Sequence, residues 1–175
     1  MDEKRIKIAE DNFKRYLNEN LIKKMPFQDI IYQTYLNNSS ESLKVAEELY
    51  NNKTSSLWVI VSSYYSMFYI ACAYMYKRGY KSSHEIVHQI INESLIVLAR
   101  HDLEKHFLEE YEEEKAKALS ATQNLLDNYE FEKSKRSQFQ YETTGEIKES
   151  KANTSLERAK NFVAIIRQLL ANKNI

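Results

Sequence analysis

The sequence predicts an all-α fold in which five or six helices pack as a bundle. Only two glycines and one proline occur among its 175 residues, whereas all-β folds need a turn about every 8–12 positions. Hydrophobic residues make up 43% of the chain, which suffices for one domain with a core but not comfortably for two. Apolar residues also recur at three- and four-residue spacing along most of the chain, and no strand is expected.

The first expected helix covers residues 3–22, where the apolar residues follow helical spacing. Pro26 ends this helix or separates it from the next one. We therefore treat residues 1–26 as an N-terminal helical extension and residues 27–175 as the main bundle domain.

Two longer helices are expected to follow it. The second covers residues 29–51 and ends in consecutive asparagines. The third covers residues 55–78, where Thr54 or Ser55 can serve as the N-cap. Gly79 is well placed to end it in a left-handed conformation.

The middle of the chain predicts a fourth and a fifth helix. Ser82 or Ser83 is expected to cap the fourth, which is shorter. Asp102 opens the fifth, which is long and keeps helical spacing of its apolar residues. It is expected to break or bend near residues 127–128 and to resume over 130–142.

The last segment predicts a loop followed by a helix. Gly145 marks the loop, and Thr154 with Glu157 three residues later has the spacing of a capping box. The apolar residues from Leu156 to Leu170 then form the clearest amphipathic stripe in the chain.

The charges of the chain balance, with 25 basic and 25 acidic residues. A dedicated nucleic-acid binder usually shows a basic excess or stripe, so any contact with nucleic acid must come from a small local cluster. The acidic run at residues 109–114 is interpreted as a solvated helix face.

Three features bear on the cellular compartment. Cys72 is the only cysteine, so no disulfide within one chain is possible, and its place in an apolar run favours a small buried hydrophobic residue. Residues 57–76 carry no formal charge and are long enough to span a membrane, but their serines and tyrosines favour a buried central helix. Residues 1–25 alternate charged and apolar side chains, unlike a secretory signal. The expectation is a cytoplasmic protein without membrane contact.

The string His84-Glu85-Ile86-Val87-His88 matches a zinc-binding pattern. On a helix the two imidazoles lie one turn apart and can share a zinc ion, while the glutamate activates a bound water. No third protein ligand is evident, and the string stands at an expected helix N-terminus, which disfavours a charged imidazole. We therefore favour a structural or polar role for His84 and His88, and expect no metal or other cofactor.

The densest basic cluster begins at Lys133 and includes Lys135 and Arg136, followed by Gln140 and Tyr141. Phenylalanines at two positions are interleaved with it. Basic groups beside aromatic rings suit contacts with phosphates and bases. A solvated polar turn of helix is an equally good interpretation of these residues alone.

Four segments together resemble the HEPN family. They are residues 63–68 (Ser-Tyr-Tyr-Ser-Met-Phe), 71–73 (Ala-Cys-Ala), 77–84 (Lys-Arg-Gly-Tyr-Lys-Ser-Ser-His) and 136–141 (Arg-Ser-Gln-Phe-Gln-Tyr). The first three resemble the second core helix of one branch and its Lys-Ser-His turn, and the last resembles its Arg-x-x-x-Asp-Tyr element. The resemblance covers about residues 34–172, so the N-terminal helix is an addition.

The resemblance implies an antiparallel bundle of four main helices and a short one, often a homodimer with a cleft between protomers. Many members are metal-independent ribonucleases of toxin or antiviral systems, with an arginine and a histidine four to six residues later paired across the dimer. The arginine would hold the phosphate, and the histidine would move the proton of the attacking 2′-hydroxyl. Other members accompany a small nucleotidyltransferase as its antitoxin-controlled partner or nucleotide-binding companion.

The sequence departs from that ribonuclease pattern at one position. Arg136 matches the family arginine, but Tyr141 stands where the histidine would be. A phenol titrates near about pH 10 against about 6.5 for imidazole, so Tyr141 would be a poor base, although it could donate a hydrogen bond to phosphate. His84 matches the Lys-Ser-His turn, and our hypothesis is that it supplies the missing imidazole from the same cleft.

The sequence therefore predicts a dimeric HEPN-type protein of a toxin–antitoxin or defence module that binds RNA or nucleotide phosphate, partnered with a nucleotidyltransferase. The candidate catalytic residues are Arg136, Tyr141 and His84. The candidate binding residues are Lys133, Lys135, Arg136, Gln140 and Lys81. Three alternatives stay open: a metal-independent endoribonuclease, a zinc hydrolase built on the histidine string, and a structural helical interaction module.

Overall fold

The computed structural model describes residues 1–83, 86–134 and 145–172; the side chains of 124–134 and 145–148 lie outside the description. The elements are α1 (Glu3–Asn18), β1 (Ile22–Lys24), α2 (Asp29–Asn51), α3 (Ser56–Lys77), β2 (Tyr80–Ser82), α4 (Val87–Ala99), α5 (Lys105–Ser134) and α6 (Gly145–Ala171). The prediction of an all-α bundle is confirmed, with a small two-stranded sheet added to it.

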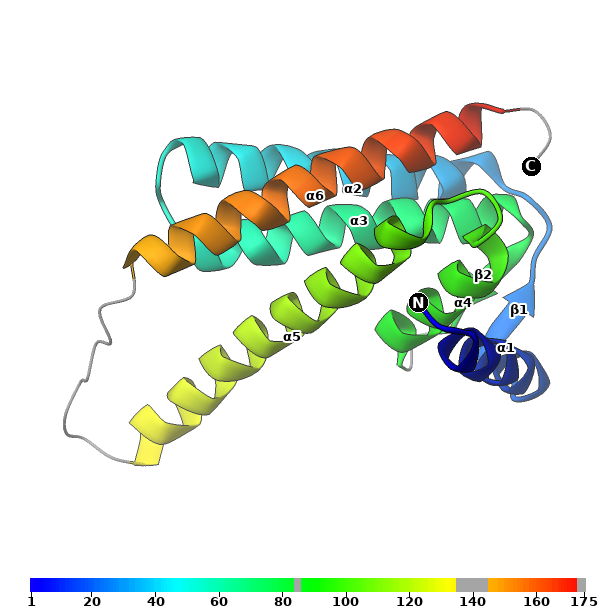
Figure 1. The fold of residues 1–175 in the computed structure, drawn as a ribbon, viewed down its shortest axis with the longest axis horizontal. Coiled ribbons are helices and arrows are strands. Elements are labelled where there is room, and N and C mark those ends of the chain that lie inside the picture. The colour runs from blue at the N-terminus through cyan, green and yellow to red at the C-terminus, as the bar shows by residue number, and fades with distance from the viewer. Residues whose placement is uncertain (84–85, 135–144, 173–175) are drawn as a thin grey trace.

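Four helices form the body of the protein and alternate in direction. Figure 1 shows α2, α3 and α6 side by side, while α5 packs on α3 and diverges from this group toward its C-terminal end. The short helix α4 packs against α1, α3 and α5. Helix α3 contacts every other helix of the bundle body and α4, so it is the centre of the core.

Helix α3 is buried over most of its circumference because its sequence carries almost no charge. Ser55 caps it by accepting a hydrogen bond from the Trp58 amide, and Gly79 follows its end with φ +86°, as the sequence predicts. Among the described residues, this is the one helix long and apolar enough to cross a membrane, but most of its residues are buried by the other helices. Cys72 is buried in it, and burial raises the pKa of its thiol.

Helix α1 is shorter than expected, and the prediction that the chain forms no strand was wrong. After α1 ends at Asn18, residues 22–24 pair antiparallel with residues 80–82. Apolar spacing extends to Leu21, but backbone pairing with a segment far along the sequence offers those residues an alternative to the helix. Phe13 and Tyr16 of α1 belong to the same hydrophobic core as α3.

Helix α4 begins later than predicted, and neither candidate serine caps it. Ser82 belongs to β2, and the Ser83 amide donates to the Leu21 carbonyl at 2.8 Å. Ile86, in a left-handed conformation with φ 42°, precedes the first helical residue, Val87. Pairing with β1 therefore places both serines several residues before the first turn of α4, so neither occupies the N-cap position.

The other two helix starts also differ from the predictions. Asp102 precedes α5 and accepts hydrogen bonds from Tyr74 and Arg78 instead of opening the helix. Helix α5 runs through residues 127–128 without the expected break, to Ser134. The second part of the expected 130–142 segment lies largely outside the described residues.

Helix α6 begins at Gly145, where a loop was expected, and it includes the Thr154–Glu157 pair in its interior. The Thr154 hydroxyl donates to the Ser150 carbonyl at 3.0 Å. The capping-box prediction was wrong because a threonine inside a helix can bond the carbonyl four residues back. Burial of Ala152 against residues of α2 and α3 stabilises the part of α6 that precedes Thr154.

Candidate functional site

Three aromatic residues form a partly exposed line along helix α3, most of whose residues are buried. Trp58, Tyr65 and Tyr69 are separated by seven and four residues, so they lie on one side of the helix. The Trp58 side chain is 51% exposed, and the two tyrosines are half-buried, with ring centroids 6.0 Å apart. We call these three residues the α3 aromatic stripe.

His88 lies beside this stripe on the first turn of α4. Its Nδ1 is 2.9 Å from the hydroxyl oxygen of Tyr64. Its ring lies 4.6 Å from the ring of Phe68 and 5.8 Å from that of Tyr65, measured between centroids. The aromatic sequence of α3 therefore holds the imidazole in a defined position at the edge of the core.

The environment of His88 favours the uncharged imidazole. Burial is the main cause that lowers its pKa, and the nearby ammonium of Lys115 on α5 lowers it further. Both effects disfavour a second positive charge at this place. Near neutral pH, His88 is thus a neutral imidazole that can accept a proton or a hydrogen bond.

Lys115 is the basic group of this site. It is half-buried, and burial lowers its pKa, with a smaller contribution from Arg5, while Glu112 and Glu93 act in the opposite direction. Within the described part of the chain its ammonium forms no ion pair. A cation removed from water without a partner is unfavourable, so an anion bound at Lys115 would relieve that cost.

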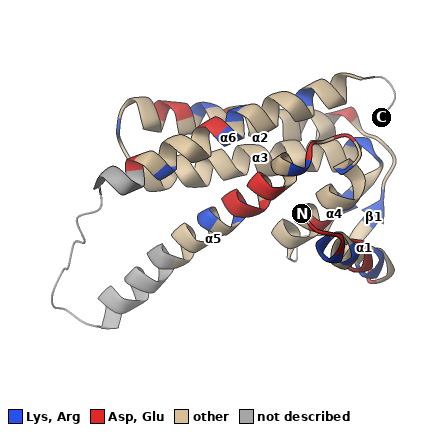
Figure 2. Cartoon of the chain, in the orientation of Figure 1, with Lys and Arg blue, Asp and Glu red and all other residues tan. Residues whose placement is uncertain are grey.

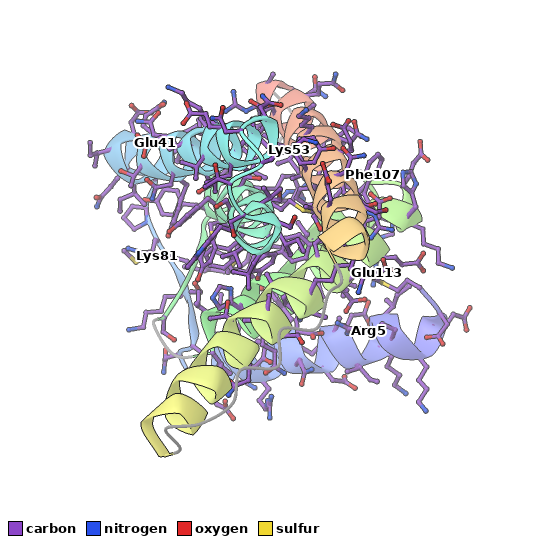
Figure 3. All side chains as sticks on the ribbon, turned by 90° about the vertical axis from the view of Figure 1, so that its left-hand side faces the viewer. Arg5, Glu41, Lys53, Lys81, Phe107 and Glu113 are labelled. Atoms are coloured by element: carbon purple, nitrogen blue, oxygen red, sulfur yellow. The ribbon has the colours of Figure 1, made fainter. Side chains whose placement is uncertain are left out.

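Arg5 explains why the neighbouring carboxylates leave Lys115 unpaired. Its guanidinium donates to Glu93 at 2.7 and 2.9 Å and to Glu112 at 3.0 and 2.6 Å. Asn92 also donates to Glu112, at 3.0 Å. These bonds join α1, α4 and α5 in one network. The network holds α5, the helix that carries Lys115, in a fixed position beside α4. Figure 3 shows Arg5 on α1, below the bundle.

The acidic run at residues 109–114 is not the simple solvated face that the sequence suggested. Glu114 is fully buried, where it accepts hydrogen bonds from Ser155, Lys117 and Arg158. Glu112 is engaged by Arg5, and Glu113 remains exposed. Burial of Glu114 follows from the packing of α6 against α5, which the run of glutamates could not reveal.

Most of the sequence-predicted site residues lie outside the described residues. These are His84, Lys135, Arg136, Gln140 and Tyr141. The side chain of Lys133, in the last turn of α5, is also outside the description. Their roles stay predictions.

Lys81 is described, and it lies on β2. Figure 1 places β2 and the C-terminal end of α5 at opposite ends of the molecule. One chain therefore does not bring Lys81 together with the end of α5 that carries Lys133. The two could serve one bound molecule only if it spans the protein or contacts two copies of it.

The zinc hypothesis rests on His84 and His88, and only His88 is among the described residues. Helix α4 begins at Val87, and His84 lies outside the described residues, so the spacing of the two histidines stays a prediction. His88 directs Nδ1 to Tyr64. Among the side chains that the structure describes, no group of three or more His, Cys, Asp or Glu is placed to hold a metal ion.

Sequence reasoning missed Trp58, Tyr69 and Lys115 as site residues. For the aromatic pair, the seven- and four-residue spacing from Tyr65 on an uncharged helix was a usable signal. For Lys115 there was none, because it directly follows a run of glutamates that would be expected to neutralise it. Its significance depends on Arg5, which is distant in sequence.

The lowered pKa of His88 predicts a pH-dependent contribution to stability. Below about pH 6.5 the unfolded chain binds a proton at this histidine more readily than the folded protein does. The free energy of unfolding should therefore fall as pH falls below about 6.5, toward the lower folded-state pKa. Urea denaturation at pH 7.5 and 5.5 should show a smaller loss in His88→Gln than in the wild type. Equal losses in both proteins would contradict the prediction.

Comparison with known proteins identifies the family. A family model described as the HEPN domain matches residues 32–169, which is most of the chain and close to the extent suggested by the sequence resemblance. Neither the search of curated proteins nor that of solved structures found a match. The antiparallel order of α2, α3, α5 and α6, with short α4 between them, agrees with the bundle expected from that resemblance. The chain therefore belongs to the HEPN family.

Proposed function

We propose that this protein binds RNA or nucleotide phosphate as part of a toxin–antitoxin or defence module. HEPN domains are generally associated with ribonuclease or toxin–antitoxin and defence roles, and the family match covers residues 32–169. The observation that carries the proposal is the α3 aromatic stripe beside His88 and the unpaired, half-buried Lys115.

The chemistry of this surface fits a nucleotide better than it fits a simple apolar partner. Exposed rings offer faces on which bases stack, and a cation beside them offers a phosphate contact. Tyr65 and Tyr69 have rings 6.0 Å apart, and Tyr65 lies 5.8 Å from His88. Because the net charge of the chain is zero, affinity for phosphate has to come from local cations such as Lys115.

A homodimer is part of the proposal. In one chain the stripe faces outward, with Trp58 half exposed, and a second protomer across it would enclose a cleft. Arg136 and Tyr141, which resemble the family's motif, would enter this cleft as phosphate ligands. We further propose that a small nucleotidyltransferase is the cognate partner, as in the branch of the family that the sequence resembles.

Ribonuclease activity is the second candidate, and one observation favours it. The motif position carries Tyr141 instead of histidine, but the described site contains an imidazole kept neutral by its surroundings, that of His88. A neutral imidazole can take the proton from an attacking 2′-hydroxyl. In this alternative Arg136 would hold the phosphate and His88 would act as the base.

One experiment tests both candidates. Labelled single-stranded RNA is incubated with the wild type in EDTA, and binding and cleavage are measured together. Replacing Tyr65 by leucine keeps an apolar side chain but removes the stacking face, so we expect about tenfold weaker binding. Tyr32→Leu serves as the matched control, because Tyr32 is a half-buried tyrosine whose ring packs on Phe27, whereas the ring of Tyr65 packs on His88.

The outcomes separate the candidates. Binding without cleavage supports the binding role. Cleavage in EDTA that disappears in both Arg136→Ala and His88→Gln supports the ribonuclease. If folded wild-type protein neither binds nor cleaves RNA or mononucleotides at high concentration, the proposal is wrong and the chain is a helical interaction module.

A further inference from the structure

Two lysines face each other across the small sheet. Lys23 of β1 and Lys81 of β2 are directly opposite partners in the antiparallel register. Successive side chains of a strand point to opposite faces, and Ile22 is buried toward the core, so the two lysines share the outward face. Figure 2 shows the basic colouring of β1 at the edge of the molecule, and Figure 3 shows Lys81 on the side away from α6.

This arrangement opposes the stability of the sheet. Like charges directly opposite each other on two strands repel, whereas opposite charges in the same positions attract. Neither lysine forms an ion pair within the described ranges. Strand β1 reads Ile-Lys-Lys and β2 reads Tyr-Lys-Ser, so neither strand supplies a carboxylate to offset the repulsion.

The backbone around the pair is well anchored. The Ser83 amide donates to the Leu21 carbonyl at 2.8 Å on one side, and the Met25 amide donates to the Gly79 carbonyl at 2.9 Å on the other. Ser83, two residues after Lys81, has a buried hydroxyl without a hydrogen-bond partner among the described residues. The two ammonium groups are thus presented by a fixed ladder rather than by a loose loop.

We propose that Lys23 and Lys81 form a phosphate-binding site that takes phosphodiester groups of the RNA or nucleotide chain. This inference rests on the proposed function and extends it to a surface formed by β1 and β2. A phosphate between the two ammonium groups removes their repulsion and gains two charge-assisted contacts. The site lies at the opposite end of the molecule from the C-terminal end of α5.

The test begins with phosphate chemistry alone. The melting temperature of the wild type is measured in sodium chloride and in sodium pyrophosphate at equal ionic strength. A ligand that binds only the folded state raises the melting temperature, so we expect a larger value in pyrophosphate. In Lys81→Glu that extra rise should disappear, while the melting temperature in chloride should increase because the introduced carboxylate would attract the ammonium of Lys23.

The control and the RNA measurement complete the design. Lys151→Glu makes the same charge change at an exposed position of α6 and should keep the pyrophosphate effect. Lys23→Gln should also lose it, which tests the site without charge reversal. For single-stranded RNA, loss of one phosphate contact should reduce the slope of log affinity against log salt by about 0.7.

Each result has one meaning. An equal pyrophosphate effect in the wild type, Lys81→Glu and Lys23→Gln would overturn the site even if RNA binds strongly elsewhere. A pyrophosphate effect that depends on both lysines, together with no RNA or nucleotide binding, would keep the anion site and overturn the proposed function. Loss of both effects in the two variants, but not in Lys151→Glu, supports the inference.

Discussion

Replacing Arg5 by methionine is expected to lower the free energy of unfolding by about 3 kcal/mol. Arg5 makes four hydrogen bonds to Glu93 and Glu112, and the side chain of Glu93 is only 6% exposed. Methionine retains the apolar stem but leaves the Glu93 carboxylate buried without its main partner. Removal of one partner of a buried pair costs about 3–5 kcal/mol, and the 24% exposure of Arg5 places this case at the lower end.

Urea or thermal denaturation measures this loss. Lys7→Met, at an exposed position of the same helix, should change the free energy of unfolding by no more than about 0.5 kcal/mol. A loss below about 1 kcal/mol in Arg5→Met would show that the network contributes little. The substitution also frees Glu93 and Glu112 to pair with Lys115, so we expect RNA binding to weaken at temperatures where the variant is folded.

Replacing Phe162 by alanine is expected to lower the free energy of unfolding by about 4 kcal/mol. Phe162 of α6 is completely buried, and its ring centroid lies 5.3 Å from that of Tyr111 on α5. Tyr111 in turn lies 6.0 Å from Tyr64 of α3. The change would therefore leave a cavity where α3, α5 and α6 meet.

The magnitude can be checked against two other substitutions. Asn161→Ala, at the preceding exposed position, should stay within about 0.5 kcal/mol of the wild type. Phe162→Leu fills part of the cavity and should cost less than half as much as alanine. A cost below about 1.5 kcal/mol for Phe162→Ala would indicate that α6 does not depend on this contact for its position.

Elements governed by local signals agreed with the sequence predictions. Helix α2 has the predicted bounds of 29–51, and α3 starts after the Ser55 cap and ends before Gly79. A cap, a left-handed glycine and a run of apolar residues act within a few positions of each other. Burial of Cys72 followed from its place in such a run.

Elements that depend on contacts between distant parts of the chain differed from the sequence predictions. Strands β1 and β2 pair residues 22–24 with 80–82, and this pairing also removes the serines that were expected to cap α4. Thr154 has the spacing of a cap, but the packing of α6 keeps it inside a helix. In each case, burial or pairing with a remote segment outweighed a local preference of about 1 kcal/mol.

For the candidate site, too, the sequence indicated some of the residues, but their arrangement depends on tertiary contacts. His88 and the aromatic run around Tyr65 were singled out in the sequence, but the histidine was assigned there to a zinc pattern or a polar contact. Its bond to Tyr64, its ring contact with Phe68 and the effect of the Lys115 charge on its pKa depend on how α3, α4 and α5 pack. Lys23 and Lys81 are far apart along the chain, and only the register of the sheet places them together.

The sequence by itself determined the helical class, the HEPN family and the central apolar helix, because composition, spacing and local motifs act over short distances along the chain. The tertiary structure alone decided which charges are paired. Arg5 is bonded to the carboxylates beside Lys115, while Lys23 and Lys81 lie opposite each other with no carboxylate paired to them among the described residues. Electrostatic energy depends on separation in space and on burial, neither of which the order of residues states.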